Sequence, residues 1–571
     1  ALPILGTTLS LNGLPDDYFI FLENGKRLYG DDTYARINVA KIKRIEILNG
    51  ASSALYGTNA IGGVINIITD DAKNAINVSS DTRYASKGRF TQSVNIDVNT
   101  GKFGSYTSYR RQQAEGWQLN PYEENSKTHE LEETGKVAST GFYANTVNQK
   151  FTFDATDKLS FYARGGYYDN KTRRPYEAYD YNILHETFNY GIGAQYMINK
   201  GNYITADCYA DHFSSSYCFF KDNKTYNGKA GEEQVRKRTR NHNLSIKGIF
   251  KLGNRHKLSV GTEYIVDVLK SQTDNIAKED AYTLALFAQD EIKLLRNLQA
   301  LIGVRYIYHE NFKNHATPNV ALMYKPGKFN FRASYAAGFR TPTLSELYAT
   351  DIAKKNDRLT IGNLDLKSEK NNYFSLSAEY VHERFSVSVN AFYNNIRDMI
   401  DYNTIATGDK AMEQYGHKEV RQRDNIAEAK VHGINVSANA YLGAGFNLSG
   451  GYTHLNTQDV ELEQPIDKSI KNAYNINAQW AHSWKIYRLN INLNGRINSK
   501  RFSKSYGYAP EYQLWNLNTR HSFNLKSVII EPGCGMENLF DYMDDRPYNS
   551  NYATLTPGRS FYISLSLKFK S

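Results

Sequence analysis

Four side chains of this sequence are candidates for binding iron. His185 and His417 could ligate the metal through an imidazole nitrogen, and Tyr348 and Tyr415 could do so through a phenolate oxygen. All four lie in polar stretches, where such side chains can also be simply solvated. The residue types alone therefore leave the ligand role open.

A second group of residues offers oxygen atoms to a hard cation. The segment YYDNKTRRPYEAYDYNILHE, residues 167–186, contains Asp169, Glu177 and Asp180, whose carboxylates suit calcium. The spacing of an EF-hand loop is not present in this segment. A calcium site and a hydrated loop of acidic and aromatic residues are therefore the two interpretations.

The sequence contains no residue set that indicates catalysis. It has three Cys, with neither a CxxC pair nor an HExxH helix, so it carries no zinc-site signature. No nucleophile, base and oxyanion arrangement is visible either. We therefore expect a protein that is not an enzyme and requires no cofactor.

The net charge of +10 is spread along the 571 residues. The densest basic stretch is VRKRTRNH, residues 235–242. A solvated loop and a contact with anionic lipid headgroups both explain this stretch. We expect no nucleic-acid partner.

The elements that carry these side chains have the period of long β-strands. In SFYISLSLKFKS, at the end of the chain, Phe561, Ile563 and Leu565 share one face, while Tyr562 and Ser564 share the other. A tilted strand needs about 9 to 11 residues to cross a bilayer, and no stretch approaches the ~20 apolar residues of a membrane helix. Because lipid-facing and lumen-facing residues alternate in a transmembrane β-barrel, its overall composition stays hydrophilic. The pattern predicts an all-β membrane barrel.

Short turns and longer polar connections alternate along the chain. Ten short turns are expected near residues 99–104, 155–158, 198–202, 252–256, 294–297, 325–328, 382–385, 442–446, 483–486 and 525–527. They join twenty strands on one rim, and one further strand at each end gives 22 antiparallel strands, an even number as closure requires. The longer connections, which include 113–142, 168–186, 214–240, 343–372 and 396–432, are expected on the outer rim.

Residues 1–75 have a different character, with short strands and many small residues. The run NGASSALYGTNAIGGVINIIT concentrates Gly50, Ala51, Ser52, Ser53, Ala54, Gly57, Ala60, Gly62 and Gly63. Small side chains let the backbone approach itself and a wall, and Gly accepts a positive φ in tight turns. Val64, Ile65, Ile67 and Ile68 then suit a core strand. Because barrels of 22 strands are the ones found plugged, we predict an α+β plug domain at residues 1–75 and the barrel at 76–571.

The run IKRIEILNGASSALYGTNAIGGVINIIT resembles the end of the plug domain of TonB-dependent outer-membrane receptors, and GMENLFDYMDDRPYNSNYATLTPGRSFYISLSLKF resembles their last two strands and loop. FRTPTLSELY and GNLDLKSEKNNYFSLSAEY are similar to the paired motif of haem and cobalamin receptors of this family. The motif positions are Phe339, Arg340, Pro342, Asn363, Asp365 and Leu366. Two departures are the lack of a His between the motifs and Leu364 in place of a Pro.

The resemblance implies a receptor in the outer membrane of a Gram-negative bacterium, energised by the TonB–ExbB–ExbD complex and surrounded by outer-membrane lipid. It also implies that the sequence begins inside the plug, after the first plug strands and the TonB box. A surface lipoprotein partner is a further expectation. Substrate would be bound by outer loops and plug apices, and the expected contacts are Tyr29, Asp31, Asp32, Tyr34, Arg36, Tyr179, His185, Tyr348, Tyr415 and His417.

The substrate expected from the resemblance is a scarce metal chelate, with haem and cobalamin as contenders. The alternative is a ferric siderophore, since Arg36, Arg173 and Arg174 could meet an anionic chelate. A passive porin would not need residues 1–75, and an adhesin would need a long passenger segment. Receptors that import glycans are usually much longer.

Overall fold

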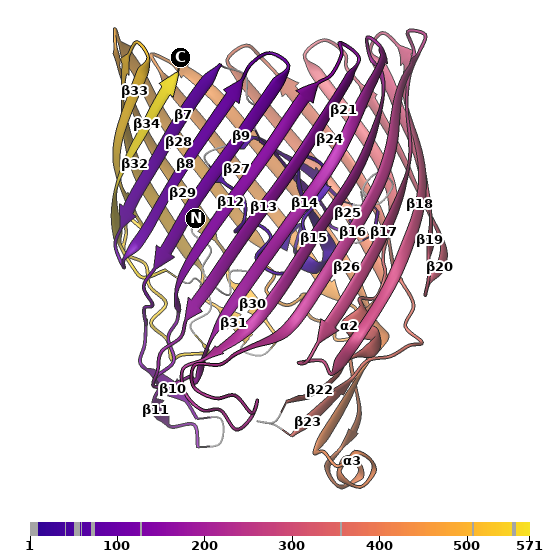
Figure 1. Cartoon of the computed structure of the whole chain (residues 1–571), viewed down its shortest axis with the longest axis vertical. Helices are drawn as coiled ribbons and strands as arrows, with labels where there is room; N and C mark the ends of the chain where they lie inside the picture. Colours follow the sequence, from indigo (N-terminus) through magenta and orange to yellow (C-terminus); the bar gives the residue numbers. More distant parts are fainter. Residues whose placement is uncertain are drawn as a thin grey trace.

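The computed structural model shows a tall, closed barrel whose strands run obliquely around a wide lumen (Figure 1). It describes residues 10–39, 42–50, 57–58, 60–69, 75–125, 128–353, 357–504, 507–550 and 556–570. Within these residues no helix is long and apolar enough to cross a membrane.

In the described part of the chain, 22 strands form the wall. They are β7 (Ile76–Ala85), β8 (Arg89–Asn99), β9 (Phe103–Ala114), β12 (Gly141–Asp154), β13 (Leu159–Arg173), β14 (Tyr181–Asn199), β15 (Asn202–Phe219), β16 (Glu233–Leu252), β17 (His256–Ser271), β18 (Ile276–Leu295), β19 (Leu298–His309), β20 (Lys313–Tyr324), β21 (Phe329–Arg340), β24 (Glu369–Val381), β25 (Phe385–Thr407), β26 (Glu419–Gly443), β27 (Phe446–Asp459), β28 (Asn472–Trp484), β29 (Tyr487–Asn498), β32 (Tyr512–Leu525), β33 (Val528–Glu537) and β34 (Ser560–Lys570). The antiparallel pairing of β34 with β7 closes the barrel, which confirms the predicted fold class.

The alternation of the last strand takes the predicted orientation. Phe561, Ile563 and Leu565 of β34 are exposed on the outer surface, where a bilayer would cover them. All ten predicted short turns join consecutive wall strands. We call the rim that carries these ten turns the turn rim, and the opposite rim the loop rim.

The predicted long connections lie on the loop rim, and three of the five, at 168–186, 214–240 and 396–432, are shorter than expected. Residues 396–432 are mostly strand, because β25 and β26 contain 23 and 25 residues and continue past the length that a bilayer requires. Residues 168–186 likewise contain the ends of β13 and β14. Paired strands keep their backbone groups satisfied outside the membrane as well as within it, so strand pairing does not stop at the lipid boundary.

Small elements fill the remaining connections of the loop rim. They are β10 (Tyr122–Glu124), β11 (Leu131–Glu133), α2 (Leu344–Tyr348), β22 (Thr350–Ala353), β23 (Arg358–Ile361), α3 (Gly408–Tyr415), β30 (Arg501–Ser503) and β31 (Gly507–Ala509). The hairpin of β22 and β23 joins the wall through parallel pairing of β23 with β26. The extended β25–β26 pair and α3 project furthest from the barrel (Figure 1).

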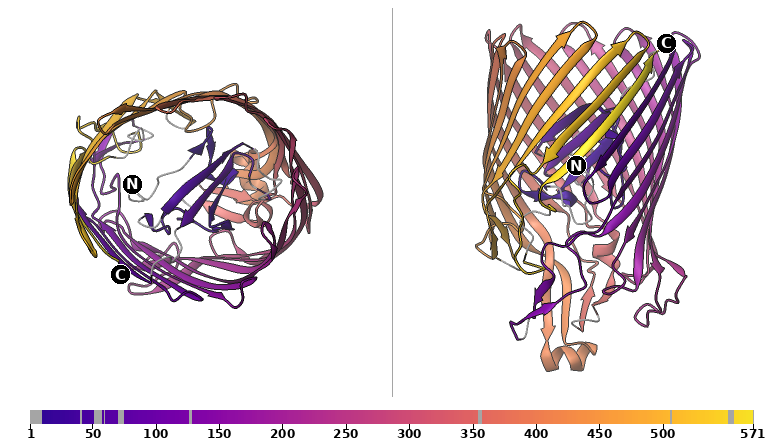
Figure 2. Two further views of the ribbon diagram at one scale, coloured as in Figure 1. Left: turned by 90° about the horizontal axis from the view of Figure 1, so that it is seen from above. Right: turned by 90° about the vertical axis from the view of Figure 1, so that its left-hand side faces the viewer.

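The plug occupies the lumen, as the view along the barrel shows (Figure 2). Its elements are β1 (Ser10–Leu11), β2 (Leu14–Pro15), η1 (Asp16–Tyr18), β3 (Phe19–Glu23), β4 (Lys26–Arg27), β5 (Ile42–Asn49) and β6 (Gly63–Thr69). Four of them form a mixed sheet in the order β4-β3-β6-β5. Val64 and Ile67 are buried, as predicted for the core strand.

The small residues of the plug allow close approaches at two described positions. Gly50 has a φ of +80°, and a Cβ there would lie 2.2 Å from the ring of Tyr373 on the wall. Gly63 has a φ of +140°, and a Cβ there would lie 2.3 Å from the carbonyl oxygen of Leu48. Both conformations favour glycine. Ala51, Ser52, Ser53 and Ala54 lie outside the described residues.

Candidate functional site

A cavity of about 250 Å³ lies between the plug and the loop rim. Its lining comprises Leu14, Pro15, Asp17 and Tyr18 of the plug and Arg340, Glu346, Met399, Ile400, Asp401, Arg423, Ala427, Glu428, Ala429, Asp459, Ile466, Asp467 and Lys504 of the barrel. Most of these side chains are charged, and few are aromatic. The cavity therefore suits a polar ligand held by hydrogen bonds and charge.

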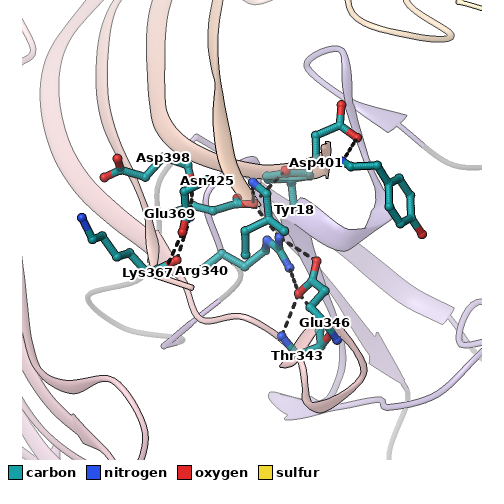
Figure 3. A network of polar contacts seen from close by, with 11 residues as sticks. Tyr18, Arg340, Thr343, Glu346, Lys367, Glu369, Asp398, Asp401 and Asn425 are labelled. Atoms are coloured by element: carbon teal, nitrogen blue, oxygen red, sulfur yellow. Dashed lines mark hydrogen bonds and ion pairs between the residues drawn. The ribbon is translucent and has the colours of Figure 1, made fainter. Parts of the chain in front are cut away.

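One wall of this cavity is an ionic network centred on Arg340 at the end of β21 (Figure 3). The guanidinium lies 3.0 Å from Glu346 Oε2 and 2.5 Å from Glu369 Oε1. The Tyr18 hydroxyl of the plug donates to Glu369 Oε1 at 3.3 Å, and the backbone N–H of Ile400 donates to the same oxygen at 2.9 Å. A single buried carboxylate thus connects the plug, β21 and β25.

Glu346 is positioned by the start of helix α2. Thr343 caps this helix, and the reciprocal bonds of a capping box link its side chain and backbone N–H to Glu346. Although burial opposes ionisation, Arg340 and Thr343 lower the pKa of the Glu346 carboxyl. Burial and the neighbouring Glu369 charge raise the pKa of Tyr18, so its hydroxyl remains a donor at neutral pH.

A second basic group bridges the far side of the cavity. Lys504 Nζ lies 3.3 Å from Asp401 and 3.3 Å from Asp459. Burial opposes its charge, yet the two carboxylates raise the pKa of Lys504. Arg423 also lines the cavity, and its guanidinium lies 3.6 Å from the ring centre of Tyr402. The described cations of the cavity therefore already contact protein groups.

The predicted plug contacts lie at a different place, against β13, β14 and β15. Arg36 lies 3.0 Å from Asp211 Oδ2, and its side chain also donates to the carbonyl oxygens of Tyr29 and Asp31. The Tyr29 backbone N–H donates to Asp211 at 2.9 Å. Tyr34 packs beside a buried cluster of the plug and the wall. These residues hold the plug to the wall.

His185 belongs to the same contact. It was expected in a loop, but it lies in β14, and its Nδ1 is 2.8 Å from Asp32 Oδ2 of the plug. The amide of Asn170 donates to the same oxygen at 3.1 Å. Although burial opposes ionisation, His185 and Asn170 lower the pKa of the Asp32 carboxyl.

The other candidate iron ligands are dispersed over the loop rim. His417 Nδ1 lies 2.9 Å from Asp357 Oδ1. Tyr415 is exposed on α3, whereas Tyr348 on α2 packs against the buried Leu347 and its neighbours. The guanidinium carbon of Arg174 lies 4.1 Å from the centre of the Tyr179 ring. None of these residues lines the described cavity.

Among the six motif positions, Arg340 lines the cavity, and the other five are not among its lining residues. Phe339 is buried and stacks on His315, with ring centres 4.6 Å apart. Leu366 is buried with Leu347 and Ile400 under the ionic network. Asn363 donates to the carbonyl oxygen of Arg423 at 3.0 Å and accepts from the backbone N–H of Asp365. Pro342 directly precedes the capping residue of α2.

Two of the three candidate calcium ligands have separate partners. Asp169 accepts from Asn145 at 2.9 Å, and Asp180 accepts from Asn223 at 2.8 Å. Glu177 lies in the connection between β13 and β14. Within the described residues, no three His, Cys, Asp or Glu side chains are grouped so that they could hold a metal ion. The calcium site stays a prediction.

Sequence reasoning missed Tyr18, Glu346 and Glu369. Glu346 had a local signal, because Thr343-Leu-Ser-Glu346 has the spacing of a capping box. Tyr18 and Glu369 are 351 positions apart, and no local pattern links them.

The fold and site define a plugged barrel, in which a lumen domain meets the loops beneath a polar cavity. Comparison with known families identifies the class. Residues 69–531 match the model for the TonB-dependent receptor-like β-barrel, and residues 4–64 match the TonB-dependent receptor plug domain. The chain therefore belongs to the TonB-dependent receptors, and it is a protein of the Gram-negative outer membrane.

Solved structures share this fold at low sequence identity. A mutant of the ferric enterobactin receptor PfeA of Pseudomonas aeruginosa has a TM-score of 0.82 and 17% identity, over 98% of this chain and 91% of that chain. The siderophore receptor PirA of Acinetobacter baumannii has a TM-score of 0.78 and 16% identity, over 98% and 91%. The FrpB iron transporter of Neisseria meningitidis has a TM-score of 0.75 and 13% identity, over 98% and 93%.

Proposed function

We propose that this receptor imports a ferric siderophore, using energy coupled through TonB. The observation that carries the proposal is the cavity between the plug apex and the loop rim, with its dense lining of charged side chains. Six of the lining side chains are carboxylates and three are cations, so the lining can accept charge-assisted hydrogen bonds from the hydroxyl and amide groups of a hydrophilic iron chelate. The likeness to receptors described as siderophore receptors supports the same substrate class.

The cavity favours a siderophore over haem. Haem receptors hold the iron through an axial side chain. The described residues that line this cavity include no His, and the hydroxyl of their one Tyr, Tyr18, donates to Glu369. His185 contacts Asp32 of the plug, while His417 contacts Asp357. A siderophore already surrounds its iron with oxygen ligands and needs no metal ligand from the protein.

Transport requires the plug to move, because it fills the lumen beneath the cavity (Figure 2). In this proposal, TonB pulls the plug from the turn rim and opens a route along the wall. Its described contacts with the wall are side-chain hydrogen bonds, ion pairs and apolar packing, and none of its described strands pairs with a wall strand. Such contacts can break without unfolding the barrel.

Uptake measurements test this function. Iron-starved cells that express the receptor are supplied with radioactive iron as ferric catecholate and hydroxamate siderophores, and in parallel with haemin and labelled cobalamin. We expect uptake of at least one ferric siderophore in cells with TonB and none in matched cells that lack it. Uptake of haemin or cobalamin alone would overturn the proposal.

A substitution that fills the cavity identifies the binding site. Ala427 lines the cavity, so Ala427→Trp would occupy much of its 250 Å³. We expect this change to weaken binding of the transported siderophore by at least about tenfold. The control is Ala230→Trp, at an exposed position in the connection between β15 and β16. Equal effects of the two substitutions would place the site elsewhere.

A further inference from the structure

The basic stretch at residues 235–242 lies on β16, close to the loop rim, and its side chains are divided between two faces. Arg238, Arg240 and His242 are exposed, as are Leu244 and Ile246 further along the same strand. The intervening Asn241 is buried, and its amide donates to Asp267 at 2.6 Å. Even-numbered positions therefore face outward from the barrel.

The lumen side of β16 supports this orientation. Asn243 and Ser245 line a cavity that is also lined by Lys26 and Arg27 of the plug. Since successive side chains of a strand alternate between faces, Arg238 and Arg240 point away from the plug. Lys237 directly precedes Arg238 and shares the lumen face with Thr239 and Asn241.

The apolar part of β16 shows where these charges lie relative to the bilayer. Leu244, Ile246 and Leu252 are exposed outward, and residues 244–252 have the length of about nine residues that crosses a bilayer. Leu244 also lines an outer groove that is mainly apolar. Arg240 and Arg238 follow on the loop-rim side of this apolar stretch, at the level where lipid headgroups lie.

The neighbouring strand adds a third cation. Lys270 of β17 is directly opposite Arg238, and it is also exposed. Among the described residues, Arg238, Arg240 and Lys270 have no carboxylate within ion-pair distance. The nearby outward carboxylates have other partners: Glu186 accepts from the Tyr167 hydroxyl at 2.9 Å, and Asp280 lies 3.2 Å from Lys278. Three cations thus face the lipid without a protein counter-charge.

We propose that Arg238, Arg240 and Lys270 form a binding site for the phosphorylated headgroup of an outer-leaflet lipid. Phosphate accepts charge-assisted hydrogen bonds from guanidinium in a bidentate manner, and Lys adds a point charge. The acyl chains of the same lipid would cover the apolar stretch that begins at Leu244. This site lies on the outside of the wall and does not depend on the transported substrate.

Native mass spectrometry of the full chain in detergent tests the site, with lipid A as the probe. The double variant Arg238→Gln/Arg240→Gln is expected to weaken lipid A binding about 30-fold, from the usual contribution of each basic residue near an anionic lipid surface. The single variants Arg238→Gln and Arg240→Gln, each expected to cost about fivefold, are matched by Lys237→Gln, which also removes one positive charge but from the opposite face of the strand. It should change the affinity less than twofold. A similar loss of lipid A affinity in the variants of both faces would overturn the proposal, because the effect would then not depend on which face of β16 carries the charge.

A second measurement uses the unaltered receptor, so it does not depend on the folding of a variant. Diphosphorylated lipid A should bind more tightly than its monophosphorylated form, and phosphatidylcholine should not displace either. Equal affinity for lipid A and its fully dephosphorylated form would overturn the site. Displacement of lipid A by inorganic phosphate at equal concentration would also overturn it, since the site would then take free phosphate rather than a lipid.

Discussion

Two of the polar contacts between the plug and the wall distribute their charges differently. At β15, the plug supplies Arg36 and the wall supplies Asp211, and the pair is almost fully buried, with side-chain exposures of 5% and 0%. At the cavity, the ion pairs of Arg340 with Glu346 and Glu369 lie within the barrel. The plug contributes the neutral hydroxyl of Tyr18 to this hydrogen-bonded network, and its Asp17 lines the same cavity.

This difference indicates which contact resists plug movement. If the plug moves, Arg36 and Asp211 are separated, and both charges lose a buried partner, which is costly. The network around Arg340 keeps its own pairs and loses one neutral donor. We therefore infer that the β15 contact anchors the plug, while the cavity contact can release it when substrate arrives.

The largest effect is expected from Arg36→Met, which keeps much of the side-chain volume but leaves Asp211 buried without its cation. Removing one partner of a buried pair usually costs about 3–5 kcal/mol. Hydrogen exchange of the amides in β3 and β6 measures the free energy of plug opening. The control is Arg44→Gln in an exposed pair of the same domain, where about 0–1 kcal/mol is expected. If Arg36→Met changed the free energy of plug opening no more than Arg44→Gln does, the β15 contact would not anchor the plug.

A smaller effect on the plug is expected from Glu369→Gln, although the barrel loses a buried charge. Arg340 retains Glu346, so the change should cost about 1.5–3 kcal/mol, the usual range for a hydrogen bond to a charged group. We expect the loss in the thermal unfolding of the whole receptor rather than in exchange of the plug amides. If Glu369→Gln accelerated amide exchange in the plug as much as Arg36→Met does, the cavity contact would also anchor the plug, which would contradict the inference.

The contact between Asp32 and His185 predicts a pH dependence of plug stability. Because the pKa of Asp32 is lowered in the folded protein, its ionised form stabilises the plug above the ordinary Asp pKa, and this stabilisation is lost as the pH falls through the lowered value. Amide hydrogen exchange in the plug should therefore be faster in acid than the intrinsic pH dependence of exchange predicts. Asp32→Asn should remove that acceleration, and an unchanged pH profile in this variant would refute the assignment.

The smallest effect is expected from Tyr18→Phe, which removes one hydrogen bond between the plug and Glu369. Such a bond contributes about 0.5–1.5 kcal/mol. The same hydrogen-exchange measurement serves as the readout, with Arg44→Gln again as the control in the plug. A loss as large as that of Arg36→Met would show that the cavity contact is an anchor too.

Much of the architecture was accessible from local patterns. The ten short turns and the alternation of β34 gave the number of strands and their outer face, because both depend on neighbouring residues. Connection lengths were overestimated, as β25 and β26 show, because polar residues in paired strands outside the membrane resemble loop residues. His185 was placed in a loop for the same reason.

What the sequence determined by itself is therefore the local period of each strand, the positions of the turns and the close approach at Gly50 and Gly63. Only the tertiary structure decided which charges meet. Asp211 lies 175 positions from Arg36, and Glu369 lies 351 positions from Tyr18. Closure of the barrel around the plug brings these side chains together, and burial then makes each pairing strong enough to matter.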